Sequence, residues 1–139
     1  MRRQPADPVV NVPDGFAFVT FISWTEALWD SDGMWSAANP TRLTAAKDGI
    51  YAVVGTCNYN GGFAGMYGAA IDQSPAGDFP GETQFAGDGT YFVNIQAVGH
   101  VRLLTSEFVE FTIEQTTGAA RPLLNEGCNF AMAWIAEYP

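Results

Sequence analysis

The chain has little positive charge and few side chains that could act as bases, nucleophiles or metal ligands. Its 139 residues include only six Lys and Arg together, one His and two Cys, and the formal net charge is −9. A surface that binds nucleic acid needs a basic patch, so nucleic acid is excluded as an expected partner. The longest apolar run, residues 16–22, is too short to cross a bilayer, and no membrane partner is expected.

The first eight residues lack the apolar run of a secretory signal. Arg2 and Arg3 are followed by Gln4 and Pro5 rather than by about 7–15 apolar residues. We therefore expect synthesis in the cytoplasm without secretion. Residues 1–14 contain three prolines and no periodicity, which predicts an extended arm ahead of one folded domain at residues 15–139.

The side chains needed for catalysis or for a cofactor do not come together in any motif. The single histidine, His100, lies within a predicted strand, and no Gly-x-Ser-x-Gly sequence is present. The segment Asp30-Ser31-Asp32-Gly33 resembles the start of a calcium loop but lacks the later Gly and Glu that complete one. An Asx turn explains it instead. We expect no enzyme activity, no cofactor and no metal.

The two cysteines, Cys57 and Cys128, belong to no Cys-x-x-Cys sequence and have no histidine near them. Metal binding is therefore not expected. We interpret them as small buried side chains in a reducing compartment. A disulfide between them remains an open alternative.

The sequence does contain many turn residues between short apolar runs. It has 15 Gly and 8 Pro, and this spacing is typical of an all-β chain. The expected strands are residues 16–22, 39–44, 50–59, 65–71, 91–104, 108–115 and 130–138. A bulge is predicted near Gly99. Residues 23–40, with three tryptophans, are expected to be a loop packed against the domain, and residues 72–89 a long loop with several turns.

Two of the expected strands are apolar on both faces. In the strand at 50–59, Ile50 and Val54 share one face and Tyr51 and Val53 the other, and residues 130–138 behave likewise. A two-layer sandwich normally leaves its outer faces in water. The extra apolar face therefore predicts an oligomer.

Residues 13–139 resemble the jelly roll of tumour necrosis factor and of the complement globular head, in the small form found in bacteriophage virion proteins. The matching segments are 16–21 (FAFVTF), 29–34 (WDSDGM), 39–44 (NPTRLT), 48–53 (DGIYAV), 103–111 (LLTSEFVEF) and 130–135 (FAMAWI). The resemblance implies an all-β, two-sheet antiparallel jelly-roll sandwich that forms a compact homotrimer. The trimer interface is then expected at Tyr51, Val53, Phe111, Phe130, Met132 and Trp134.

A short arm and a single domain favour a non-enzymatic virion protein over a tail fibre with a long shaft. We expect a trimeric capsid decoration protein on the capsid surface, bound to the major capsid protein through its arm. The expected capsid contacts are Arg2, Arg3, Pro5, Pro8, Val9 and Val10. The alternative is a receptor- or glycan-binding adhesion module at a tail tip, which would use aromatic side chains in residues 59–67 and 79–85.

Overall fold

The computed structural model describes residues 1–74, 78–90 and 92–138, and this part of the chain is built from strands without a helix. The strands are β1 (Asn11–Val12), β2 (Gly15–Phe21), β3 (Arg42–Thr44), β4 (Gly49–Tyr59), β5 (Ala64–Ser74), β6 (Asp78–Asp88), β7 (Asn94–Leu103), β8 (Phe108–Thr116) and β9 (Arg121–Ala136). Within the described ranges, nothing helical is long and apolar enough to cross a membrane.

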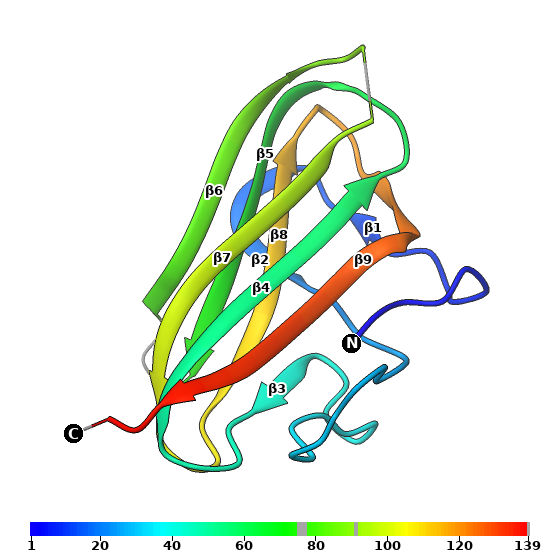
Figure 1. The fold of residues 1–139 in the computed structure, drawn as a ribbon. Helices are drawn as coiled ribbons and strands as arrows, with labels where there is room; N and C mark the ends of the chain where they lie inside the picture. Colours follow the sequence, from blue (N-terminus) through cyan, green and yellow to red (C-terminus); the bar gives the residue numbers. More distant parts are fainter. Residues whose placement is uncertain (75–77, 91, 139) are drawn as a thin grey trace.

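The strands form two antiparallel sheets that face each other (Figure 1). One sheet has the order β1-β9-β4-β7, and the other has the order β2-β8-β5-β6, with β3 also paired to β8. Because consecutive strands are distributed between the two sheets, the chain crosses the sandwich repeatedly. The architecture is the antiparallel jelly roll that the sequence predicted.

Most predicted strands are confirmed, but the predicted loop at residues 72–89 is wrong. Most of it forms β6, which pairs with β5 from Ala64↔Asp88 to Gln73↔Asp78. Pro80 and two glycines made this stretch look like a series of turns. Proline is tolerated in an edge strand, and β6 ends the order of its sheet.

The predicted bulge near Gly99 is also wrong. The β4–β7 ladder runs without a shift from Gly49↔Leu103 to Asn58↔Asn94. Gly99 instead allows β6 to come close, since a Cβ at this position would lie 2.9 Å from the carbonyl oxygen of Pro80. Gly81 approaches Val98 in the same way, so the two glycines bring the edges of the two sheets together.

The core between the sheets contains five of the six residues predicted to form the trimer interface. Tyr51, Val53, Phe111, Phe130 and Met132 are at most 7% exposed and pack inside a single chain. Trp134 is half-buried beside this core, with the Lys47 ammonium 3.7 Å from its ring centre. These five side chains therefore belong to the core of a single chain, where large side chains fill the space of about 10 Å between packed sheets.

The predicted arm lies against the sandwich instead of extending away from it. Arg3 is 4% exposed, and its guanidinium donates to Asn125 Oδ1 (2.9 Å) and to the carbonyl oxygens of Ser23 and Pro8 (2.6 Å to Pro8). Val12, in β1, is fully buried. Arg3 is therefore excluded as a capsid contact in this conformation.

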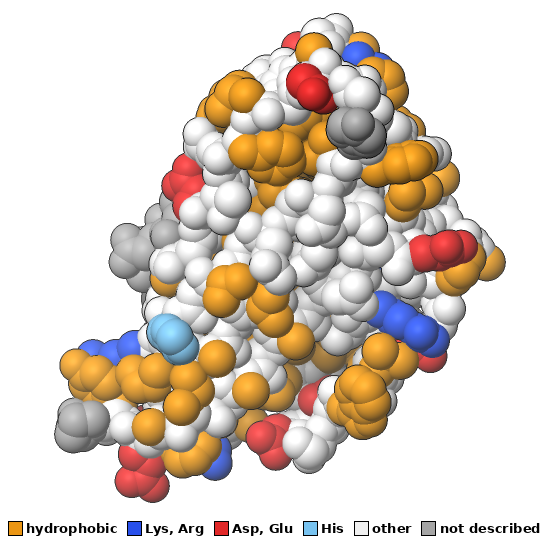
Figure 2. All heavy atoms as spheres, turned by 45° about the horizontal axis from the view of Figure 1, so that its top comes forward, with side chains coloured by type: hydrophobic (Ala, Val, Ile, Leu, Met, Phe, Trp, Pro, Cys, Tyr) orange, Lys and Arg blue, Asp and Glu red, His pale blue; other side chains and the backbone are white. Residues whose placement is uncertain are grey.

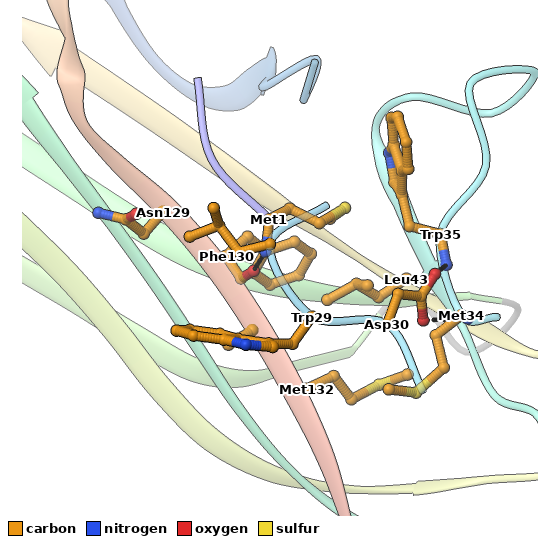
Figure 3. Close-up of a pocket in the computed structure, with 11 residues that line it drawn as sticks. Met1, Trp29, Asp30, Met34, Trp35, Leu43, Asn129, Phe130 and Met132 are labelled. Carbon is orange, nitrogen blue, oxygen red and sulfur yellow. Dashed lines mark hydrogen bonds between the residues drawn. The ribbon is translucent and has the colours of Figure 1, made fainter. Parts of the chain in front are cut away.

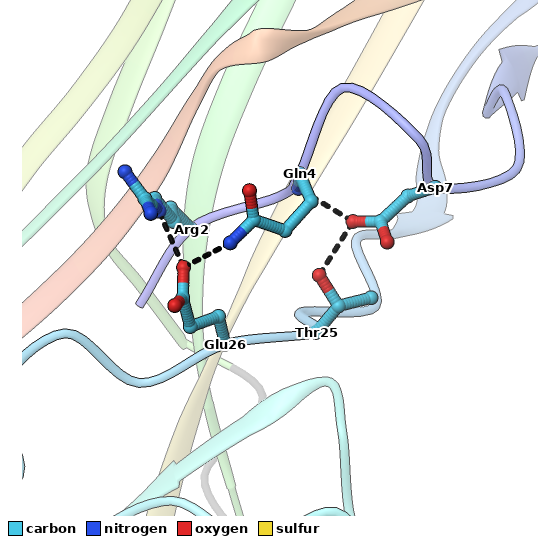
Figure 4. A network of polar contacts seen from close by, with 5 residues as sticks. All are labelled: Arg2, Gln4, Asp7, Thr25 and Glu26. Atoms are coloured by element: carbon cyan, nitrogen blue, oxygen red, sulfur yellow. Dashed lines mark hydrogen bonds and ion pairs between the residues drawn. The ribbon is translucent and has the colours of Figure 1, made fainter.

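Polar side chains of the arm also bind the loop after β2. Figure 4 shows Glu26 accepting from Arg2 and Gln4, while Asp7 accepts from Thr25 and from the backbone N–H of Gln4. The hydrogen bond from Thr25 is the largest influence that lowers the pKa of Asp7. Pro5, Pro8 and Val9 remain exposed, and Val10 is half-buried.

Candidate functional site

The outer surface of the β9–β4–β7 sheet carries a continuous row of small apolar side chains. We call it the apolar sheet face, and it consists of Ile50, Ala52, Val54, Val98, His100, Ala131 and Ala133. Register places Val54 between Val98 and Ala131, and Ala52 between His100 and Ala133. Val98 is 59% exposed. The face is therefore apolar and open in a single chain.

No carboxylate belongs to the apolar sheet face. Its basic side chains are His100 and, at its edge, Arg102, which pairs directly with Ile50. The space-filling view shows a middle region of white and orange spheres, with red and blue spheres toward its margins (Figure 2). A surface without carboxylates can meet a second copy without the repulsion between acidic side chains that the net charge of −9 would otherwise cause.

The outer surface of the other sheet differs, because it carries carboxylates. Asp72 is paired directly with Glu110, and Glu82 lies across from Ala70 on the next strand. Burial raises the pKa of Asp72, and the negative charge of Glu110 raises it further. Glu110 is also ion-paired with Arg42 (3.5 Å), so this surface carries charges of both signs. Charged groups are costly to bury at an interface, so the contrast favours the apolar sheet face for self-association.

Replacing Asp72 by asparagine is expected to raise the melting temperature at pH 7. The pKa of Asp72 is raised in the folded state, so folding is less favourable with the charged carboxylate than with the protonated one. Its contribution to stability is present below the pKa of the unfolded chain and is lost as the pH rises through the folded value. Thermal unfolding of both proteins should show a gain at pH 7 that disappears near pH 3, and a gain independent of pH would contradict this cause.

A pocket of about 320 Å³ opens between β9 and the loop that follows β2. Met1, Met34, Phe130 and Met132 contribute to its lining, and Trp29 lies at its side (Figure 3). Trp29 is 91% exposed, although the sequence predicted that all three tryptophans of this loop pack against the domain. Trp24 is buried and Trp35 half-buried, as predicted.

The loop that carries Trp29 is held by Asp30. The Asp30 carboxylate accepts from the backbone N–H groups of Met34 (2.7 Å) and Trp35 (3.1 Å), and Gly33 has φ 66°. The Asp30 carboxylate thus holds backbone N–H groups of its own loop. Its partners lie four and five residues further on, and not two as in the predicted Asx turn. Across the described residues, no group of three His, Cys, Asp or Glu side chains could hold a metal ion.

The aromatic side chains predicted for glycan binding are mostly core residues. Tyr59 and Tyr67 are fully buried, with ring centres 4.9 Å apart, and Phe85 stacks on Tyr67. Phe63 is half-buried under the Arg121 guanidinium, and the side chain of Phe79 is outside the described ones. Trp29, which directly precedes Asp30, is 91% exposed, and no local pattern in the sequence distinguished it from the other two tryptophans of its loop.

Comparison with known proteins supports the architecture. Neither the known family models nor the curated proteins match this sequence. Among solved structures, the globular domain of zebrafish complement 1qA protein matches 95% of this chain and all of its own, with 13% identity and a TM-score of 0.53. The fold is a C1q-like jelly roll. At this identity the likeness shows the fold alone, because one fold hosts many functions.

Proposed function

We propose that this C1q-like chain is a non-enzymatic structural protein that functions as a homotrimer. The observation that carries this proposal is the apolar sheet face, an open surface without carboxylates in a chain with net charge −9. Monomeric soluble proteins rarely leave a large contiguous apolar patch exposed. The order of motifs along the sequence, which resembles the trimeric jelly rolls, supports three copies around a closed axis.

Replacing Ala131 by glutamate tests the trimer. Ala131 is exposed and lies beside Val54, so a glutamate is tolerated in a single chain but buries three carboxylates in a trimer. We expect light scattering to give the monomer mass of 15.0 kDa, with the near-ultraviolet circular dichroism of a folded chain.

The matched control for this substitution is Ala86→Glu. Ala86 is exposed on β6, in the other sheet, and pairs with Met66. This variant should keep the trimer mass. If both variants keep it, the apolar sheet face is not the interface. If both lose it, the loss reflects added charge and not the position of the substitution.

We further propose that the trimer decorates a bacteriophage capsid, that the protein is made in the host cytoplasm, and that it binds the major capsid protein in the virion. The support is the phage-type resemblance in the sequence, together with exposed apolar residues in the arm. Because Arg3 is buried, the proposed contacts are Arg2, whose side chain is 41% exposed, and the exposed Pro5, Pro8 and Val9. Val9, at 58% exposure, is the largest of these apolar side chains.

Replacing Val9 by aspartate is expected to lower occupancy on the capsid without changing the trimer mass. Deleting residues 1–12 is a poor test, because it removes the buried Arg3 and Val12 and so is expected to destabilise the whole domain. Occupancy is measured on purified virions assembled with the Val9→Asp protein, with Ala86→Asp as the control. Equal occupancy for both variants would contradict the arm contact.

The alternative function, glycan or receptor binding at a tail tip, is favoured by one observation, the exposed Trp29 beside an apolar pocket. Flat indole rings stack on sugar rings and serve as anchors at interfaces. Glycan-array binding that Trp29→Ala removes and Phe92→Ala retains would support adhesion over decoration. Phe92 is a suitable control because it is 70% exposed and lies away from this pocket.

A further inference from the structure

Cys57 and Cys128 lie on the neighbouring strands β4 and β9, where the pairing of the two strands shifts register. In the β4–β9 ladder Thr56 pairs with Asn129. Cys57 follows Thr56 in β4, and Cys128 precedes Asn129 in the antiparallel strand β9. Both cysteines are fully buried and both are free. Their side chains point from the same side of the sheet into the same core.

This position fits the geometry of a disulfide bond. Directly opposite residues of antiparallel strands have Cα atoms about 4.5–5.5 Å apart. Disulfide bonds span Cα separations of about 4.4–6.8 Å. The two thiols of the structure are already within hydrogen-bonding reach of each other. A covalent bond therefore requires little movement of the backbone.

The register of the ladder shifts at these two cysteines, between Thr56 and Asn58. Asn58 pairs with Leu124, so three extra residues of β9 bulge out next to Cys128, and the Cys128 thiol donates to the carbonyl oxygen of Leu124 (3.4 Å). Here β4 and β9 are joined by fewer backbone hydrogen bonds than along the rest of the ladder. A cross-link at this point would hold the two strands where their own pairing is interrupted.

The surroundings make the two thiols chemically unequal. The hydrogen bond with Cys57 lowers the pKa of Cys128, and the positive charge of Arg3 acts in the same direction. Burial raises the pKa of Cys57. The Arg3 backbone N–H also donates to the carbonyl oxygen of Cys128 (3.3 Å), which keeps the arm beside the pair. Cys128 is thus the better nucleophile, since the thiolate is the reactive form.

We propose that Cys57 and Cys128 form a dithiol site that a small-molecule disulfide oxidises to an intrachain cross-link. The Cys128 thiolate attacks one sulfur of the oxidant, which forms a mixed disulfide and releases one thiol. Cys57 then loses its proton and attacks Sγ of Cys128, which forms the Sγ–Sγ bond and releases the second thiol. Two electrons pass to the oxidant, and the two cysteine protons leave with its two thiol products.

The proposal is independent of the trimer and of the capsid, because both thiols lie inside one chain. The reduced pair is compatible with a reducing cytoplasm, and the cross-link forms when the protein meets an oxidising medium. The bond joins residues 71 positions apart in sequence, so it restricts the unfolded chain strongly. We expect it to raise the melting temperature by roughly 5–15 °C.

The test incubates the full reduced chain with oxidised glutathione in two arms, one native and one during refolding from guanidinium chloride. Free thiols are then alkylated under denaturing conditions, and intact mass and a non-reducing peptide map are recorded. The expected result, in the refolding arm where the thiols are accessible, is a protein with no alkylated cysteine and a peptide pair linking Cys57 to Cys128. Its melting temperature should fall back to that of the reduced protein after treatment with dithiothreitol.

The matched controls are Cys57→Ala and Cys128→Ala, each of which replaces one buried thiol with a methyl group. Neither variant should gain melting temperature from the oxidant. The proposal is overturned if both cysteines remain alkylated in both arms. It is also overturned if the only products are glutathione adducts or links between chains.

Discussion

Replacing Phe111 by alanine is expected to lower the free energy of unfolding by about 3–5 kcal/mol. The Phe111 ring lies at the centre of the core, 5.9 Å from the ring centre of Phe130 and 6.4 Å from that of Trp24. Gly55 leaves space for it, since a Cβ there would lie 2.1 Å from the ring. Alanine leaves a cavity that the two flanking sheets cannot close. Urea denaturation followed by tryptophan fluorescence measures the loss.

The matched control for this prediction is Phe92→Ala. Phe92 is 70% exposed, so removing its ring should change the free energy of unfolding by about 0.5 kcal/mol or less. The same two variants distinguish the interface role that the sequence predicted for Phe111 from its position in the core. An interface role predicts that Phe111→Ala dissociates the oligomer and leaves the folded monomer stable. The core position predicts that Phe111→Ala lowers the stability of the folded chain itself.

Replacing Arg3 by alanine is expected to cost about 3 kcal/mol, because its guanidinium is buried and donates to three oxygen atoms. Truncation leaves Asn125 Oδ1 and the carbonyl oxygens of Ser23 and Pro8 without this donor, at about 1–3 kcal/mol for each group that stays buried. The variant should also lose protection of the arm against proteolysis. Chemical denaturation and limited proteolysis together measure both effects.

Arg2→Ala provides the control within the same segment. The Arg2 side chain is 41% exposed and forms an ion pair with Glu26, and such surface pairs contribute about 0.2–1 kcal/mol. Similar losses for the two variants would contradict the structural role assigned to Arg3. A loss confined to Arg3→Ala would show that the arm is part of the folded domain.

The sequence predicted the strands whose alternation or apolar character was strong. In β8, Val109, Phe111 and Ile113 alternate with polar residues, and all three are fully buried. In β4, the run from Gly49 to Tyr59 was recognised almost to its ends. The strand β6 was missed because its proline and glycines resemble turns, and its pairing with β5 is a contact that no local pattern encodes.

The candidate site was predicted only in outline. The sequence showed that β4 and β9 are apolar on both faces, but local pattern does not say which face is turned inward. Large side chains such as Tyr51 and Phe130 fill the core, which leaves the smaller Ala52 and Ala131 outside. Likewise, the exposure of Trp29 depends on how Asp30 holds its loop. Both features arise from the tertiary fold.

The self-association of the chain through the apolar sheet face is tested most directly by the mass of the unmodified protein in solution. Sedimentation equilibrium at micromolar concentration should give about 45 kDa, three times the 15.0 kDa of one chain. A mass of about 15 kDa under the same conditions would contradict it.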